Sequence, residues 1–269
     1  MLKNIIWYTV TTISIIGIII LSIGFYKAIS LTSGANTSTQ ISNDTIDNQV
    51  SNNPTDKTSN SIILTIIGDS VAKGTGDETG KGFAGNISNI MNSKTSKEVK
   101  IENLGVDGFR SSNLLEQIKT GKLDSLLKTS DFILISIGGN DLRTIQNEDD
   151  SSRQAGFDTL KSQYISDLKD IIKLIREQNN KAYIVFVGLY DPYIASGSFI
   201  DGELLRDWNY TTQQLLETDD SSIFVTTYDL IKFNTAKYIA MDGLHPNAAG
   251  YQSISSRIVD SIESLIVNK

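Results

Sequence analysis

Apolar residues follow two different patterns along this chain. Short unbroken runs, rich in β-branched side chains, occupy residues 62–67, 132–137 and 182–187. Such runs are typical of strands that are buried on both faces of a parallel sheet. Weaker runs of the same kind predict two further strands at residues 99–103 and 223–226.

The second pattern is helical, with apolar positions three or four residues apart. It extends from Phe157 to Ile175 and predicts a long amphipathic helix that ends at residues 178–180, where Gln and Asn follow one another. Similar spacing predicts two more helices, one near residues 202–217 and one from Pro246 to the C-terminus.

The order of these elements predicts the fold class. Strands that alternate with helices favour a three-layer α/β/α sandwich around a mostly parallel five-stranded sheet, with right-handed crossovers. We assign this domain to residues 62–269. The polar stretch 144–155 has neither pattern, and we expect it to be a loop that can serve as a lid.

A separate apolar run, residues 5–25, contains no charged side chain. Its length matches the ~20 residues that a helix needs to cross a bilayer, and aromatic residues lie near both of its ends. We therefore predict an uncleaved signal anchor, a transmembrane helix, within residues 1–27. The alternative is a cleaved signal peptide, for which the small residues at 33–35 would be the cleavage site.

Residues 28–61 predict a flexible polar linker, because Ser, Thr, Asn and Asp dominate them and too few bulky apolar residues are present to form a core. The basic residues Lys3 and Lys27 flank the apolar run and give only a weak orientation signal. An anchor followed by such a linker favours a single-pass cell-membrane protein whose folded domain is extracellular. Cleavage of the anchor would make the protein secreted.

Charge and cysteine content argue against several classes of function. The net charge is −7, and no cluster of Lys and Arg is visible, which argues against a nucleic-acid partner. The chain contains no cysteine, so disulfides, thiolate chemistry and cysteine-ligated zinc are excluded. We expect no cofactor and no metal, and a monomer.

Polar residues and glycines gather where the predicted strands end. Gly68-Asp69-Ser70 follows the first strand, 103–105 follows the second, 138–141 follows the third, and 242–246 precedes the last helix. The carboxyl ends of parallel strands form one edge of a sheet, where active sites of such folds lie. The sequence therefore predicts that these four segments converge on one site.

The chain has a single histidine, His245, and it lies three residues after Asp242. A carboxylate at this distance can hold one imidazole nitrogen, which fixes the tautomer and leaves the other nitrogen free as a general base. A base of this kind needs a nucleophile, and Ser70 is the best candidate. Asp69 and Asp141 are better explained as helix caps or loop braces than as catalytic groups.

These four segments, in this order, resemble the SGNH/GDSL hydrolase family of esterases and lipases, whose members have a flavodoxin-like sheet. The resemblance covers residues 62–269, and membrane-anchored bacterial members are similar in layout. It implies that Ser70 is the nucleophile, His245 the base and Asp242 its orienting acid. It also implies an oxyanion hole formed by the N–H groups of Ser70 and Gly105 and the side-chain amide of Asn140.

The function that we expect is acyl-ester hydrolysis through a covalent acyl-enzyme. Lipid or lysophospholipid esters near the membrane are the leading substrates, and O-acetyl groups on envelope carbohydrates are the main alternative. Transfer of the acyl group to another alcohol is also open, because an acyl-enzyme can react with alcohols other than water. A hypothesis of another class is a membrane-tethered binding module that has the fold but no turnover.

Overall fold

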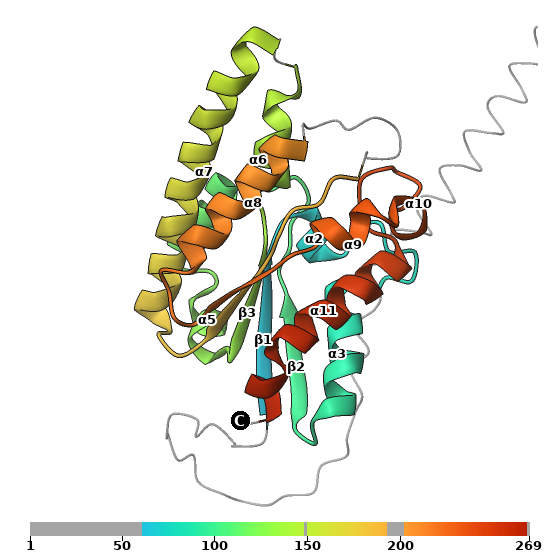
Figure 1. Ribbon diagram of the computed structural model, residues 1–269. Helices are drawn as coiled ribbons and strands as arrows, with labels where there is room; N and C mark the ends of the chain where they lie inside the picture. The colour runs from blue at the N-terminus through green and yellow to red at the C-terminus, as the bar shows by residue number, and fades with distance from the viewer. Residues whose placement is uncertain (1–60, 148–149, 193–201, 268–269) are drawn as a thin grey trace, which may run out of the picture. The chain divides into compact units, whose positions relative to one another are not determined.

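The computed structural model describes residues 61–147, 150–192 and 202–267 of the 269-residue chain (Figure 1). The predicted anchor at 1–27 and all of the predicted linker at 28–61 except Ser61 lie outside the described residues. Within the described ranges, no helix combines the length and the apolar character that crossing a membrane requires.

All five predicted strands are present, within one residue of the expected bounds. They are β1 (Ser61–Gly68), β2 (Glu98–Asn103), β3 (Phe132–Ser136), β4 (Tyr183–Val187) and β5 (Ser222–Val225). Each neighbouring pair is parallel. The strand order is β2-β1-β3-β4-β5, which places a topological switch point between β1 and β3. Sheets of this order form their ligand crevice beyond the carboxyl ends of the strands at that point.

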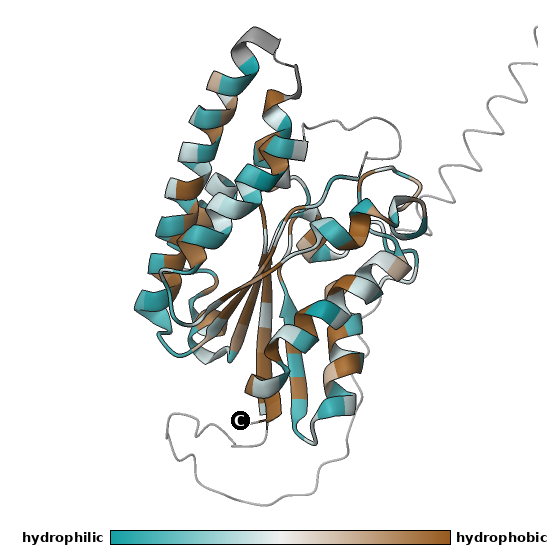
Figure 2. Ribbon diagram, viewed as in Figure 1, coloured by the Kyte–Doolittle hydropathy of each residue, from teal (hydrophilic) through white to brown (hydrophobic). Residues whose placement is uncertain are grey.

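Helices cover both faces of the sheet and complete three layers (Figure 1). Alternate residues of the central strands point to opposite faces: Ile66 and Leu134 pack with α3 and α11, whereas Ile67 and Ile135 pack with the core beneath α4, α7 and α8. Figure 2 shows the same division, with apolar residues along the strands and on the inward faces of the helices. The strands are apolar without interruption because both of their faces are buried.

The three predicted long helices are confirmed as α7 (Asp150–Gln178), α8 (Gly202–Leu216) and α11 (Ala248–Val267). The remaining helical elements are short or were not predicted from periodicity: α2 (Ser70–Lys73), α3 (Gly82–Lys94), α4 (Ser111–Lys119), α5 (Asp124–Thr129), α6 (Gly139–Leu142), the 3-10 helix η1 (Arg143–Asn147), α9 (Tyr228–Lys232) and α10 (Thr235–Tyr238). Glycine and asparagine make α3 a weak helix by propensity. Its Phe83, Ile87 and Met91 are nevertheless completely buried, so packing decides its structure.

The prediction of a loop over residues 144–155 is wrong. The segment is largely helical, because η1 extends to Asn147 and α7 begins at Asp150. Its polar composition does not prevent helix formation: in the first turns of α7, Gln154 is exposed and Arg153 is half-buried. Burial of Ile145 and Phe157 fixes both ends of the segment to the core.

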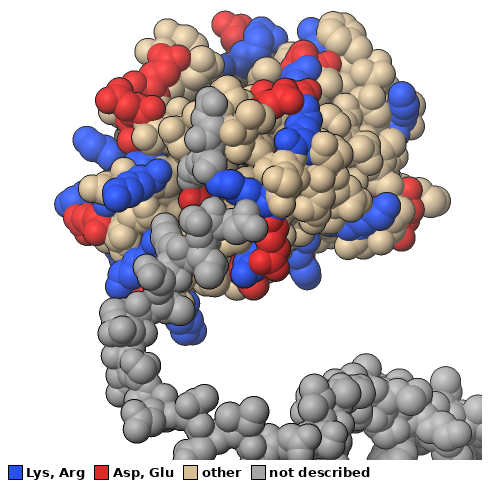
Figure 3. Space-filling model, turned by 90° about the horizontal axis from the view of Figure 1, so that it is seen from below, with Lys and Arg blue, Asp and Glu red and all other residues tan. Residues whose placement is uncertain are grey.

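The surface seen from below carries both signs of charge. Where described residues are visible in Figure 3, Lys and Arg side chains are interspersed with Asp and Glu, and neither sign forms a continuous patch. That face therefore lacks the continuous basic surface to which nucleic acids bind.

Candidate active site

Ser70 is positioned by a sharp turn at the end of β1. Gly68 has a φ of +135°, and a Cβ atom there would lie 1.9 Å from the carbonyl oxygen of Ser136 on β3, so only glycine fits. The Asp69 N–H then donates to that same oxygen at 2.9 Å. Asp69 caps α2 by accepting the Val71 N–H at 2.9 Å. The turn leaves Ser70 at the first position of α2, facing the crevice.

Asp242 shapes the loop that carries the histidine. Its Oδ1 accepts the N–H groups of Leu244 and His245 at 2.9 and 3.0 Å, and its Oδ2 lies 2.7 Å from His245 Nδ1. One carboxylate oxygen therefore folds the loop while the other orients the imidazole. The Tyr190 hydroxyl donates to the Leu244 carbonyl oxygen at 3.0 Å and braces the loop from β4.

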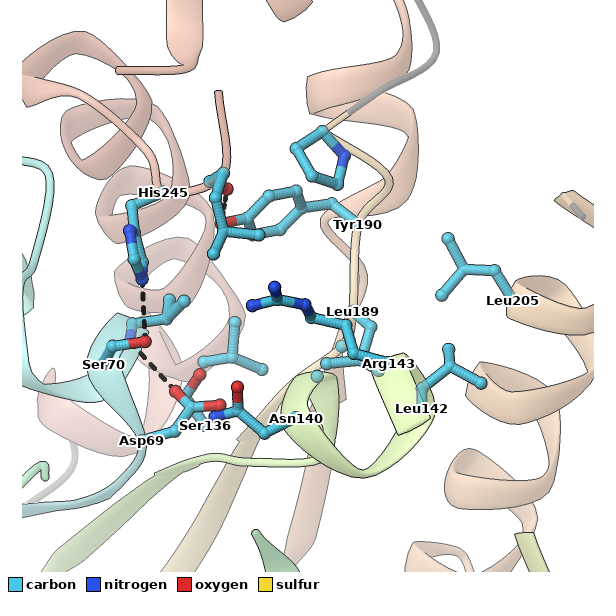
Figure 4. Close-up of a pocket in the computed structure, with 16 residues that line it drawn as sticks. Asp69, Ser70, Ser136, Asn140, Leu142, Arg143, Leu189, Tyr190, Leu205 and His245 are labelled. Carbon is cyan, nitrogen blue, oxygen red and sulfur yellow. Dashed lines mark hydrogen bonds between the residues drawn. The ribbon is translucent and has the colours of Figure 1, made fainter. Parts of the chain in front are cut away.

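The imidazole of His245 connects the two distant segments. Its Nε2 lies 2.8 Å from Ser70 Oγ, across 175 residues of sequence. Because Nδ1 faces a carboxylate, the neutral ring carries its hydrogen on Nδ1 and presents the Nε2 lone pair to the serine hydroxyl. Ser70, His245 and Asp242 thus form the connected arrangement that the sequence predicts. Figure 4 shows the contact between Ser70 and His245.

Two carboxyl groups at the site have opposite pKa shifts. Burial raises the pKa of Asp69 to about 7, although the N–H groups of Val71 and Ala72 oppose the shift. At Asp242 burial also acts to raise the pKa, but hydrogen bonds from His245 and from the loop N–H groups outweigh it and hold the pKa below its ordinary value. Asp242 is therefore ionised at neutral pH and can stabilise a protonated imidazole.

Asn140 reaches the site from α6, which follows β3. The turn requires Gly138, whose φ is +116°. One hydrogen of the Asn140 amide is donated to the Phe109 carbonyl oxygen at 2.9 Å, and the residue lines the pocket beside Ser70. Its neighbour Asp141 accepts hydrogen bonds from the N–H and hydroxyl of Ser111, which confirms its role as a brace.

Gly105 does not offer the free N–H group that the resemblance implies. Its N–H is donated to Asn103 Oδ1 at 3.0 Å, and a Cβ on it would lie 2.3 Å from the backbone nitrogen of Lys73. Gly105 therefore allows this loop to pack against α2, and its N–H is not free to bind an oxyanion. Gly108, three residues later, has a φ of +77°, no atom within 4 Å of an added Cβ, and an N–H that bonds to no described acceptor.

A pocket opens beside Ser70 and His245, and its empty space, including the open solvent at its mouth, is about 700 Å³. Its walls are largely apolar and include Leu142, Val187, Leu189, Tyr190, Leu205 and Leu244. Within the described ranges, no group of three or more His, Asp or Glu side chains could hold a metal ion.

Besides Gly108, two further residues of interest at the site, Gly76 and Arg143, were not predicted from the sequence. Gly76 lies against the backbone of the histidine loop, where a Cβ would be 2.5 Å from the Cβ of His245. Arg143 lines the pocket. A glycine outside any strand–helix turn and an arginine in a polar stretch carry no distinctive signal, so only the tertiary structure shows their positions.

Comparisons with known proteins agree with this arrangement. The GDSL-like Lipase/Acylhydrolase family model matches residues 66–253. The uncharacterized protein YpmR of Bacillus subtilis (strain 168) is 32% identical over 213 residues, which cover 77% of this chain and 84% of that protein.

Solved structures share the fold at lower identity. The lipase Lip_vut3 from a goat rumen metagenome superposes with a TM-score of 0.65 at 21% identity, covering 74% of this chain and 97% of that one. A family 3 carbohydrate esterase of Clostridium thermocellum superposes with a TM-score of 0.60 at 16% identity, covering 77% and 98%. The matched family model and the related Bacillus sequence show that this chain belongs to the GDSL-like lipase/acylhydrolase family of carboxylic ester hydrolases.

Proposed function

We propose that the protein is a serine esterase of the lipase type that hydrolyses lipid or lysophospholipid esters through an acyl-enzyme. One observation carries the proposal. Ser70 Oγ, the His245 imidazole and the Asp242 carboxylate are joined by contacts of 2.8 and 2.7 Å beside an apolar pocket. A serine hydroxyl alone is a weak nucleophile at neutral pH, and a base at hydrogen-bond distance activates it.

The reaction proceeds in two steps. His245 Nε2 takes the proton of Ser70 Oγ as the oxygen attacks the ester carbonyl carbon, and the resulting imidazolium is stabilised by Asp242. When the tetrahedral intermediate collapses, the imidazolium gives that proton to the departing alcohol oxygen and the acyl group remains on Ser70. Water then attacks the acyl-enzyme with His245 again as base, releasing the carboxylic acid and the free serine.

The negative charge on the carbonyl oxygen requires donors that are already in place. The Ser70 N–H is available, because the first N–H groups of a helix have no partner within the helix. The second hydrogen of the Asn140 amide is another donor. For the third we propose the Gly108 N–H in place of Gly105, since its loop is held against Asn140 through the Phe109 carbonyl. Removal of one such donor costs about 3 kcal/mol of barrier.

Apolar walls support a lipid acyl chain as the acyl part of the substrate. Leu142 and Leu205 are almost completely buried, and they contribute to the wall at a distance from Ser70 (Figure 4). Burial of acyl methylenes contributes about 0.8 kcal/mol each, so a longer chain is expected to bind more tightly as far as the pocket extends.

A second candidate is a carbohydrate O-acetyl esterase, which the structural likeness to a carbohydrate esterase favours. Such an enzyme needs only a short acyl pocket and polar contacts to a sugar. Chain-length selectivity separates the two candidates. A panel of p-nitrophenyl esters from acetate to long chains, together with lysophospholipids, decides between them: strictly acetyl-selective turnover would contradict the lipase, and rising activity toward long chains would contradict the deacetylase.

The nucleophile is tested with a fluorophosphonate probe, which reacts covalently with an activated serine. We expect the parent protein to be labelled and Ser70→Ala to remain unlabelled. Ser136→Ala is the matched control, because Ser136 also lines the pocket, whereas the described hydroxyl that is hydrogen-bonded to His245 Nε2 is that of Ser70. Equal labelling of the parent and Ser70→Ala would contradict the assignment and leave a binding module as the better hypothesis.

Location is part of the same proposal. We propose that residues 5–25 anchor the protein in the cell membrane and that the hydrolase domain is extracellular, near its lipid substrate. Protease treatment of intact cells tests this orientation, since an extracellular domain is released while a cytoplasmic one is protected. N-terminal sequencing of the native protein tests cleavage, and a start at Asn36 would contradict the anchor.

A further inference from the structure

The pocket carries a charge that ester hydrolysis does not require. Arg143 is the first residue of η1, and it contributes to the pocket wall together with Ser70 and His245. In Figure 4 its side chain extends from the green helical segment toward the Ser70–His245 pair, whereas Leu142 and Leu205 lie on the other side of the pocket. The guanidinium is thus directed at the space where the ester bond would be.

Arg143 has no anionic partner among the residues that the structure describes. No ion pair or hydrogen bond joins its side chain to any residue that the structure describes, whereas Arg176 and Arg257 each pair with an aspartate. The pocket wall does contain Asp69, but burial raises the pKa of that carboxyl to about 7, so it is only partly ionised at neutral pH, and no ion pair or hydrogen bond between it and Arg143 is found in the described part of the chain. An unpaired guanidinium at a substrate pocket is suited to bind an anion from the ligand.

The burial of Leu142 and the exposure of Arg143 indicate which part of the substrate would carry that anion. Leu142 is completely buried and the adjacent Arg143 is exposed, so the wall changes from apolar interior to charged rim within one residue. An acyl chain favours the apolar interior, which leaves the alcohol part of the ester at the rim. Planar guanidinium groups bind phosphate oxygens through paired, charge-assisted hydrogen bonds.

We propose that Arg143 is a specificity-determining residue that binds the phosphate on the alcohol part of a lipid ester, so that the enzyme prefers lysophospholipids to neutral glycerides. This inference rests on the proposed ester hydrolysis at Ser70 and names the substrate class of that site. It assigns Arg143 to substrate binding and gives it no part in proton transfer.

The test compares two esters with the same octanoyl chain on glycerol, one neutral (monooctanoylglycerol) and one carrying a phosphate (octanoyl-glycerophosphate). The full-length parent is expected to have the higher kcat/KM for the phosphate ester. Arg143→Gln is expected to lower the ratio of the two kcat/KM values about tenfold, mainly through KM, and Arg143→Lys to restore part of it. Raising the salt concentration should reduce the ratio in the parent more than in Arg143→Gln.

Arg110→Gln is the matched control, because it removes the same charge from an exposed arginine that does not line the pocket. A ratio of the two kcat/KM values that is the same in Arg143→Gln and the parent would overturn the inference, as would an equal loss in Arg110→Gln.

A second experiment tests whether Arg143 binds an anion on the acyl part of the substrate. It uses an octanoyl ester with a carboxylate at the end of its acyl chain. If Arg143→Gln lowers kcat/KM for that ester alone, the assignment of Arg143 to the phosphate is wrong. Fluorophosphonate labelling of Ser70 separates these outcomes from failure of the proposed hydrolase function.

Discussion

Gly76 lies so close to His245 that a Cβ atom at position 76 would be 2.5 Å from the Cβ of the histidine. The same Cβ would be 2.7 Å from the Pro246 carbonyl oxygen. The segment after α2, at Gly76, therefore packs directly against the loop that carries His245. This contact, together with the Asp242 hydrogen bonds, fixes the distance between Nε2 and Ser70 Oγ.

Gly76→Ala is expected to reduce kcat strongly, because the methyl group must push the histidine loop away from Ser70. Misplacement of a reacting group by ~1 Å can cost about 10²-fold. Gly80→Ala is the matched control: Gly80 also has a positive φ, at +68° against +93° for Gly76, but no atom lies within 4 Å of its added Cβ. Both variants share the backbone strain, so steady-state kinetics on p-nitrophenyl butyrate should show the large loss in Gly76→Ala alone.

Asp69→Asn is expected to change how stability depends on pH. Burial raises the pKa of Asp69 from 3.8 to about 7 in the folded protein. Between these values the folded state binds more protons at this group than the unfolded state, so its contribution to the free energy of unfolding falls as pH rises from about 4 to about 7. The asparagine oxygen can still accept the Val71 N–H but carries no charge.

Urea unfolding of the parent and Asp69→Asn at pH 4.5 and pH 8 measures this effect. The free energy of unfolding of the variant, relative to the parent, should increase by about 3 kcal/mol over that interval. Parallel pH dependences for the two proteins would show that Asp69 titrates near its ordinary pKa.

Asn179→Ala is expected to destabilise the fold by about 2–4 kcal/mol, because it leaves several buried backbone groups without partners. The Asn179 side chain donates to the carbonyl oxygens of Leu127 and Ser130 at 2.7 and 2.9 Å and accepts the Lys181 and Ala182 N–H groups at 3.0 Å each. It joins the end of α7 to the loop that precedes β3.

Asn180→Ala is the control for this variant, since Asn180 is exposed. Thermal or urea unfolding should show a change within about 0.5 kcal/mol for it. A similar loss of unfolding free energy in both variants would mean that termination of α7, and not the buried hydrogen bonds of Asn179, determines stability at the end of this helix.

Local patterns were sufficient for the elements that are long and strongly apolar. The five strands and the three longest helices were predicted because burial on one or both faces imposes a repeat of two or about 3.6 residues on the sequence. Helix α3 escaped prediction because its glycines and asparagines mask the repeat. The prediction of a loop at 144–155 was wrong because polar residues also occur on the surface of helices, and polarity alone does not distinguish such a helix from a loop.

The sequence by itself determined the reacting groups. A single histidine with an aspartate three residues before it, and a serine after the first strand, limited the candidates to Ser70, His245 and Asp242, and the order of the strands placed them at one edge of the sheet. Only the tertiary structure decided which backbone groups surround them. The Gly105 N–H is occupied by Asn103, Gly76 seats the histidine loop, and Arg143 faces the pocket. These relations depend on contacts between segments far apart in the chain, and no local repeat in the sequence records them.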